Sequence, residues 1–213
     1  MNQAIRKESG VLRGFEHISR SWDKQHDMMC ARVAPGEFYA TKEQECISTV
    51  LGSCIAACIR NVRTGAGGMN HFMLPGDPGR NGSAWQTSDA LETRFGVAAM
   101  ESLINEILKL GARKPDLEVK LFGGGEILNM QNSAVGKRNV EFALRFMQEE
   151  GYEVISQDLG GPHPRKVIYF PETGKVLVKR LRAIQTATIV AQENKYVDGF
   201  DTQQSTGSIE LFD

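Results

Sequence analysis

The chain of 213 residues lacks the features that would place it in several large classes of protein. It has no long uninterrupted hydrophobic run, so we expect no membrane insertion, and its N-terminus lacks the apolar core of a signal peptide. The formal net charge is only -1 and the pI is near 6.4, so no basic surface for nucleic acid is expected. These absences together predict a cytoplasmic protein.

Cysteine is also scarce, and its spacing argues against a metal site. The four cysteines are Cys30, Cys46, Cys54 and Cys58, and they form no CxxC pair of the kind that zinc sites use. In a reducing compartment we expect free thiols rather than disulfides. If residues 54–58 are extended, the sulfurs at the two ends lie roughly 13 Å apart, too far to share one ion. We therefore predict no metal site.

Two apolar, strand-like runs at residues 54–60 and 69–74, joined by a turn-rich loop, are the most informative part of the chain. Cys54 begins the first run directly after Gly52-Ser53, and His71 lies inside the second. Two paired strands would bring the thiol and the imidazole together. Cysteine catalysis requires this pair, because the imidazole takes the thiol proton and nearby backbone N–H groups hold the oxyanion.

Each member of this pair also has an ordinary structural interpretation. A cysteine in a strand is usually core packing, and a lone strand histidine is usually structural. The flexible approach to Cys54 and the presence of His71 on the neighbouring run together favour catalysis. A third group should orient the imidazole. Ser48 is favoured because it has the same strand parity as Cys54; the other candidates are Thr49, Asn70 and His163.

The remaining pattern predicts a mixed fold. Apolar residues recur every fourth position after Asp89 and predict a long helix ending near Gly111, and a second helix is predicted at residues 135–150. Strands are predicted at residues 38–40, 117–122, 153–157, 166–170 and 175–181. We therefore expect an α/β (α+β) fold, a mixed β-sheet or sandwich with two long helices packed outside.

Composition divides the chain into three parts. A single catalytic domain is expected at residues 34–184, between an N-terminal arm of residues 1–33 and a polar C-terminal tail of residues 185–213, with both termini flexible. Within the domain, Gly123-Gly124-Gly125 fits no nucleotide-binding loop and is expected to let another backbone segment or a partner approach closely. Leu128, shortly after these glycines, is predicted to be exposed near the active site.

Several segments, taken in order, resemble one known family. They are ISTVLGSCIAACIRN, GGMNHFMLP, LEVKLFGGGEIL and RKVIYFPETGKVLVKRL, within residues 35–181. Together they are similar to CheD, the chemoreceptor glutamine deamidase family of chemotaxis. The resemblance implies a cytoplasmic hydrolase that converts glutamine side chains of methyl-accepting chemoreceptors to glutamate, releasing ammonia without a cofactor. It also implies binding to a CheC-type phosphatase where that partner exists.

The resemblance assigns roles to individual residues. It implies that Cys54 is the nucleophile and His71 the base of a thioester mechanism. The third member of the family site, a threonine, falls on Ser48, which keeps the hydroxyl but lacks the methyl group. Thr49 is the next residue and stays an alternative.

Two rival functions use the same residues differently. The chain could be a non-catalytic chemotaxis adaptor that binds receptors and a CheC-type phosphatase. It could also be another enzyme with the same dyad, such as a small amidase or a transglutaminase-like acyl transferase. Rapid alkylation of Cys54 near neutral pH would distinguish a catalytic thiol from a packing cysteine.

Overall fold

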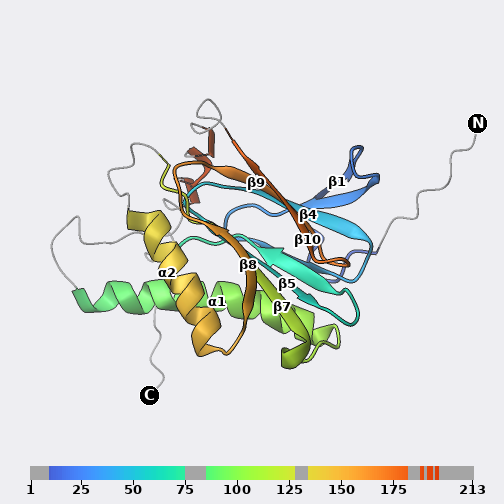
Figure 1. The fold of residues 1–213 in the computed structure, drawn as a ribbon, viewed down its shortest axis with the longest axis horizontal. Helices are drawn as coiled ribbons and strands as arrows, with labels where there is room; N and C mark the ends of the chain where they lie inside the picture. The colour runs from blue at the N-terminus through green and yellow to red at the C-terminus, as the bar shows by residue number, and fades with distance from the viewer. Residues whose placement is uncertain are drawn as a thin grey trace, which may run out of the picture.

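The computed structural model describes residues 10–74, 85–127 and 134–181, and near the C-terminus residues 188–189, 191–193 and 195–196. In this part of the chain the strands form two five-stranded sheets (Figure 1). The first has the order β1 (Ser19–Asp23), β2 (Met28–Arg32), β4 (Glu45–Leu51), β9 (Arg165–Phe170), β10 (Lys175–Arg180). The second has the order β3 (Phe38–Thr41), β6 (Gly67–Asn70), β5 (Ile55–Asn61), β7 (Leu117–Gly123), β8 (Val154–Leu159).

Each sheet combines antiparallel pairs with one parallel pair. In the first sheet β2 and β4 are parallel, and in the second β7 and β8 are parallel. The other neighbouring strands are antiparallel. The predicted mixed, α+β architecture is thereby confirmed.

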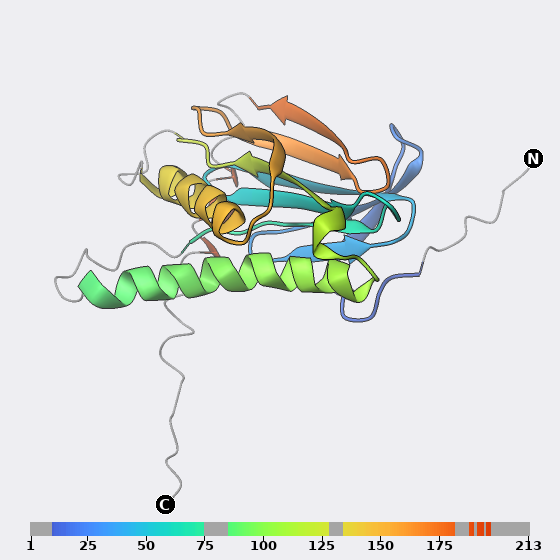
Figure 2. The same cartoon turned by 60° about the horizontal axis from the view of Figure 1, so that its bottom comes forward.

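Two long helices cover the second sheet. Helix α1 (Trp85–Lys109) packs on β3, β5 and β6, and α2 (Ala134–Glu149) packs on β5 and β7. Figure 2 shows α1 running along the outer side of this sheet. Strand β5 is buried over almost its whole length, which explains why its sequence is apolar on both faces.

Two details differ from the sequence-based expectations. Residues 19–32 were predicted to belong to the N-terminal arm, but they contain strands β1 and β2. The side chains of β1 are mostly polar and partly exposed, so its sequence has no apolar pattern that would predict a strand. Strand β6 ends at Asn70, and beyond it a single bridge joins Phe72 to Ile55. The side chain of Asp89 lies outside the described part of the structure. Leu128, which was predicted to be exposed, lies outside it as well.

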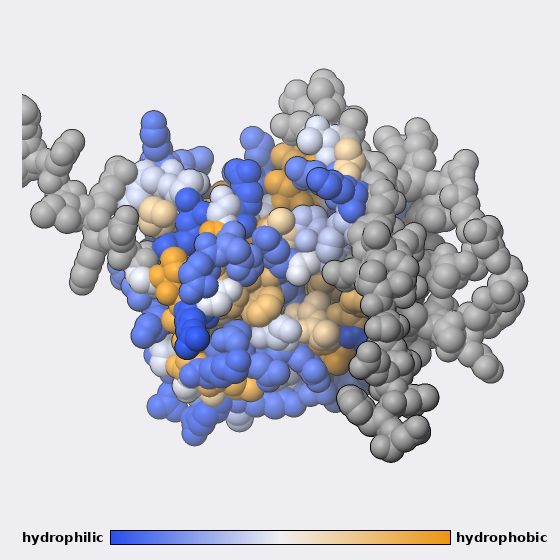
Figure 3. Space-filling model, turned by 180° about the vertical axis from the view of Figure 1, so that it is seen from behind, coloured by the Kyte–Doolittle hydropathy of each residue, from blue (hydrophilic) through white to orange (hydrophobic). Residues whose placement is uncertain are grey.

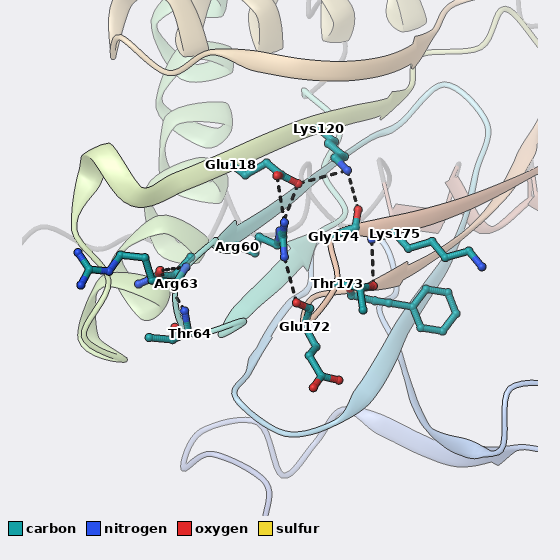
Figure 4. A network of polar contacts seen from close by, with 11 residues as sticks. Arg60, Arg63, Thr64, Glu118, Lys120, Glu172, Thr173, Gly174 and Lys175 are labelled. Carbon is teal, nitrogen blue, oxygen red and sulfur yellow. Dashed lines mark hydrogen bonds and ion pairs between the residues drawn. The ribbon is translucent and has the colours of Figure 1, made fainter.

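A group of charged side chains ties the second sheet to the β9–β10 turn (Figure 4). Arg60 on β5 contacts Glu118 on β7 at 3.2 Å and donates to the carbonyl oxygen of Glu172 at 3.0 Å. Lys120 on β7 donates to the carbonyl oxygen of Gly174 at 2.6 Å. Because Glu172 and Gly174 lie in the turn of the first sheet, these contacts hold the two sheets together at one end.

Apolar residues are dispersed over the surface seen in Figure 3, in separate patches among hydrophilic ones. The large apolar side chains exposed in the described part are Val62, Leu144 and Ile155, which belong to a loop, a helix and a strand. Within the same part, none of the helices has the length and apolar character needed to cross a membrane.

Candidate active site

The structure brings Cys54 and His71 together at the start of β5. Ile55 and Phe72 exchange two backbone hydrogen bonds of 2.9 Å each in an antiparallel bridge, so Cys54 and His71 lie diagonally across the pair with both side chains on the same face. Both Cys54 and His71 are buried. The Sγ atom of Cys54 and a ring nitrogen of His71 lie within 4.8 Å of each other. A thiol and an imidazole at this separation can exchange a proton after a small adjustment.

The hydroxyl of Thr49 determines which imidazole nitrogen carries hydrogen. Thr49 Oγ1 donates its single hydrogen to the carbonyl oxygen of Val33 at 2.7 Å. It also lies 2.7 Å from Nδ1 of His71, so it must accept a hydrogen from that nitrogen. The other nitrogen, Nε2, then has a free lone pair, and it is buried without a hydrogen-bond partner among the described residues. Nε2 is therefore the basic nitrogen available to the thiol.

Ser48 lies on the opposite face of β4 from Thr49. Its Oγ atom is 3.4 Å from the carbonyl oxygen of Ala31 on β2, where it serves as a donor. The parity argument that favoured Ser48 assumes an unbroken strand, but the bend at residues 52–53 interrupts the alternation before Cys54. The structure thus brings Thr49 rather than Ser48 to His71.

The two other candidates for the third group have different surroundings. The Asn70 side chain accepts from the Ala57 amide at 2.8 Å and donates to the carbonyl oxygen of Ala99 at 3.0 Å. It therefore links strand β5 to helix α1. His163 is exposed in the segment before β9. Neither side chain is hydrogen-bonded to the His71 ring.

Glu193 is a site residue that no sequence pattern indicated. Its carboxylate accepts hydrogen bonds from the backbone amides of Gly52, Ser53 and Cys54 at 2.9, 3.1 and 3.2 Å, and from the Ser53 hydroxyl at 2.7 Å. The side chain is buried, and a carboxylate oxygen lies within 4.8 Å of the Cys54 sulfur and a His71 nitrogen. Consecutive amides converging on one anion form a nest.

Glycine is needed at position 52 for this approach. A Cβ atom there would lie 2.9 Å from both carboxylate oxygens of Glu193 and 2.0 Å from Cδ1 of Ile127. The Gly-Ser pair before the cysteine therefore does more than bend the chain. It leaves room for a carboxylate, or for a group of similar shape, directly against the backbone amides.

Burial keeps both members of the dyad uncharged in this arrangement. Burial raises the pKa of the Cys54 thiol well above its usual value, and the Glu193 carboxylate raises it further. Burial lowers the pKa of His71 to about 4, against the opposing attraction of Glu193. With Glu193 in place, a thiol faces a neutral imidazole, which is a less reactive state than the thiolate–imidazolium pair.

The same three side chains contain atoms of the kinds that bind zinc. The carboxylate of Glu193, however, already accepts four hydrogen bonds, three of them from backbone amides. These donors suit an anion, so we assign an anion site rather than a metal site. A second group, Asp23 with Cys30 and Cys46, has its carboxylate paired with His26 at 2.8 Å.

Two backbone supports hold the nucleophile in place. The Asn139 side chain on α2 donates to the carbonyl oxygen of Ser53 at 2.8 Å and accepts from the amide of Leu74 at 2.9 Å. Gly124 donates to the carbonyl oxygen of Cys54 at 2.8 Å. A Cβ atom on Gly123 would lie only 2.1 Å from that oxygen, which confirms that this glycine triplet permits close backbone approach.

Two clefts open beside His71, with volumes of about 530 and 800 Å³, and Cys54 lines neither of them. His71, Lys195 and Tyr196 line both of them. Thr49 and Ile189 line the larger one, and Phe95 lines the smaller one. Lys195 and Tyr196 therefore lie beside His71 in the walls of both clefts.

Comparison with known proteins identifies the family of the chain. A family profile described as "CheD chemotactic sensory transduction" matches residues 73–180. A protein of Halorhodospira halophila named "Probable chemoreceptor glutamine deamidase CheD" is 48% identical over 206 residues, covering 94% of this chain and 93% of its own. Proteins of the same name from Hahella chejuensis and Hydrogenovibrio crunogenus are 42% and 44% identical, covering 100% and 92% of this chain and 100% of their own lengths. The chain therefore belongs to the CheD family, which confirms the resemblance predicted from its sequence.

Proposed function

We propose that the chain is a cytoplasmic protein-glutamine deamidase that converts glutamine side chains of methyl-accepting chemoreceptors to glutamate in chemotaxis. The observation that carries this proposal is the arrangement of Thr49, His71 and Cys54 beside three converging backbone amides. The hydrogen bond of 2.7 Å between Thr49 and Nδ1 supports a base with its free lone pair on Nε2. The names of the relatives supply the substrate class.

The reaction proceeds through a thioester. His71 Nε2 takes the Cys54 thiol proton, and the sulfur attacks the carboxamide carbon of a substrate glutamine. The carbon–nitrogen bond breaks, and the nitrogen takes the proton from His71 and leaves as ammonia. Water then attacks the thioester, His71 accepts its proton, and the sulfur leaves the carbon and recovers a proton. The sum is glutamine plus water giving glutamate plus ammonia.

The backbone amides of Gly52, Ser53 and Cys54 are the proposed oxyanion donors. They point at one place next to the nucleophile, and in this structure they hold a carboxylate there. A tetrahedral intermediate places negative charge on an oxygen in the same position. Removing one such donor from an enzyme commonly costs about 100- to 1,000-fold in kcat.

Thr49 is the proposed positioning residue for His71. Its hydroxyl holds the ring orientation and the tautomer, which Ser48 does not do from its place on the other face of β4. A CheC-type phosphatase is the second partner that we propose, on the family resemblance alone.

A non-catalytic adaptor is the second candidate function, and one observation favours it. Cys54 is fully buried, and its thiol pKa is raised, which describes an unreactive cysteine. The deamidase proposal requires that the group covering Cys54 moves away when substrate binds. An adaptor has no such requirement.

Incubation with a recombinant receptor cytoplasmic fragment tests the deamidase proposal. Each converted glutamine adds about 1 Da to the fragment and releases one ammonia. Cys54→Ala is expected to abolish both signals. Cys58→Ala is the matched control, because Cys58 is equally buried on β5 but lies away from the amide nest. Full conversion by Cys54→Ala, or none by the unaltered protein, would contradict the proposal.

A further inference from the structure

A helical segment near the C-terminus lies over the proposed active site. The described residues between 188 and 196 are helical (dark red in Figure 1). Ile189 and Glu193 are buried and Tyr196 is partly buried, whereas Ala191 and Gln192 are exposed. The three covered residues follow the spacing of one helix face, i, i+4 and i+7. One face of this segment therefore packs against the domain.

Glu193 occupies the position that a reaction product would occupy. Glutamine deamidation produces the γ-carboxylate of a glutamate, and Glu193 presents that group. Its carboxylate is held by the three amides that we propose as oxyanion donors and by the Ser53 hydroxyl. It also lies within 4.8 Å of the Cys54 sulfur. A helical segment of the chain thus places a glutamate side chain in the active site that we propose to produce glutamate side chains.

We infer that the described helical residues 188–189, 191–193 and 195–196 form a product-like plug, and that the receptor helix binds in the same place with its glutamine side chain in the position of Glu193. This inference rests on the proposed function. It identifies the substrate as an α-helical segment, bound through the surface that the plug now covers. It also makes the plug a competitor that must leave before a receptor glutamine can enter.

The neighbours of Glu193 on the plug indicate what else the cleft recognises. Ile189, four residues earlier, is 6% exposed and lines the larger cleft. The ring of Tyr196, three residues later, lies so close to Gly36 that a Cβ atom there would meet it at 2.4 Å. The cleft is therefore expected to prefer a glutamine with an aliphatic residue four positions before it and an aromatic or other large residue three positions after it.

Replacing Glu193 by glutamine turns the plug into an intramolecular substrate. In Glu193→Gln the carboxamide would lie against the same amides, and Cys54 would convert it back to glutamate. Peptide mapping of the purified variant is then expected to find glutamate at position 193, formed at a rate independent of protein concentration. Gln192, exposed in the same peptide, is expected to stay glutamine. The double variant Glu193→Gln/Cys54→Ala is expected to keep glutamine at both positions.

Measuring receptor deamidation by Glu193→Gln distinguishes an error in the plug hypothesis from an error in the proposed function. If Glu193→Gln deamidates the receptor but keeps its own glutamine at position 193, the plug is overturned and the deamidase stands. If neither the receptor nor position 193 is converted by a folded protein, the deamidase itself is overturned. Conversion at position 193 supports the plug, whichever outcome the receptor shows.

The receptor KM gives a second test, because the plug should compete with the receptor for the same site. Glu193→Ala removes the carboxylate from the nest, so the receptor KM should fall while kcat is unchanged. If the plug is seated about nine-tenths of the time, the fall is about tenfold. Glu149→Ala, an exposed acidic residue at the end of α2, is the matched control and should leave KM unaltered. An unchanged KM in Glu193→Ala would show that the segment does not compete with the receptor, and would overturn the plug.

Discussion

The identity of the hydroxyl that meets His71 depends on a single residue position. Thr49 and Ser48 are adjacent and chemically alike, and only their faces on β4 distinguish them. Thr49 bonds Nδ1 at 2.7 Å, whereas Ser48 bonds the carbonyl oxygen of Ala31. Counting parity from Cys54 cannot decide between them, because the bend at residues 52–53 lies in the counted stretch.

Thr49→Ala is expected to lower kcat by about 10- to 100-fold, because the imidazole loses both its orientation and its tautomer preference. Thr49 accepts the Nδ1 hydrogen and so favours the protonated ring. Its loss should therefore lower the pKa of His71 and move the acidic limb of the kcat/KM profile to lower pH. Steady-state kinetics across pH measures both effects.

Two matched variants complete this test. Thr49→Ser keeps the hydroxyl and should restore most of the rate, whereas Ser48→Ala should leave kcat within about threefold. A greater loss from Ser48→Ala than from Thr49→Ala would give the positioning role to Ser48 instead.

Cys54 and His71 could be paired from the sequence because both lie in recognisable runs that neighbour each other along the chain. Glu193 could not be found in the same way. It bonds the Cys54 amide across 139 sequence positions. Its segment reads as part of a polar tail, and only the spacing of Ile189, Glu193 and Tyr196 hints at a packed helix face. Backbone amides have no sequence signature, so a nest formed by them is visible only in the structure.

At the scale of elements, helix α2 supports the site through one side chain. Asn139 is fully buried and bonds the carbonyl oxygen of Ser53 and the amide of Leu74. It thereby connects the turn that carries the nucleophile to the segment that follows His71. The predicted helix at residues 135–150 agrees with the observed α2, because its apolar period is clear. The function of a polar residue on its buried face could not be derived from that period.

Asn139→Ala is expected to destabilise the fold by about 2–4 kcal/mol, because it leaves one buried donor and one buried acceptor unsatisfied. Urea denaturation measures the change. Lys137→Ala, on an exposed turn of the same helix, should cost less than about 0.5 kcal/mol. The folded fraction of Asn139→Ala should also turn over more slowly, since Ser53 loses a support. A loss below about 1 kcal/mol would mean that water or another group replaces the amide.

Strand existence was easier to predict than strand pairing. The strands predicted at residues 166–170 and 175–181 appear as β9 and β10, since their apolar runs flank a clear turn at residues 171–174. Polar β1 carries no comparable signal. No local pattern indicates that β4 pairs with β2 on one side and with β9 on the other. Those pairings join residues far apart in the chain, and packing of the whole domain decides them.

At the scale of the whole molecule, the two sheets are connected where the chain passes from β8 to β9. Arg165, at the start of β9, is 2% exposed and lies 3.0 Å from the carboxylate of Asp158 on β8. Its guanidinium also donates to the carbonyl oxygens of Asp158, Gly160 and His163. Arg165 thus fixes the crossover between the two sheets. It lies at the opposite end of β9 from the β9–β10 turn, which Arg60 contacts (Figure 4).

Arg165 and Arg180 offer a matched comparison, because both contact Asp158 but only Arg165 is buried. The Arg180 guanidinium lies 3.6 Å from that carboxylate and its side chain is 68% exposed. Arg165→Met is expected to cost about 3 kcal/mol, since it leaves a carboxylate and several carbonyl oxygens without their donor. For a chain of this size the melting temperature should fall by about 6–12 °C.

Arg180→Met should cost less than about 1 kcal/mol, because water already solvates that side chain and screens the pair. Thermal melts of the two variants, repeated at high salt, measure the contrast. High salt should remove the small effect of Arg180 and leave most of the effect of Arg165, whose contacts are shielded from solvent. Equal losses in the two variants would mean that the charge of Asp158 matters more than the buried crossover. In that case the contacts of Arg60 and Lys120 with the β9–β10 turn, rather than Arg165, would be the main connection between the sheets.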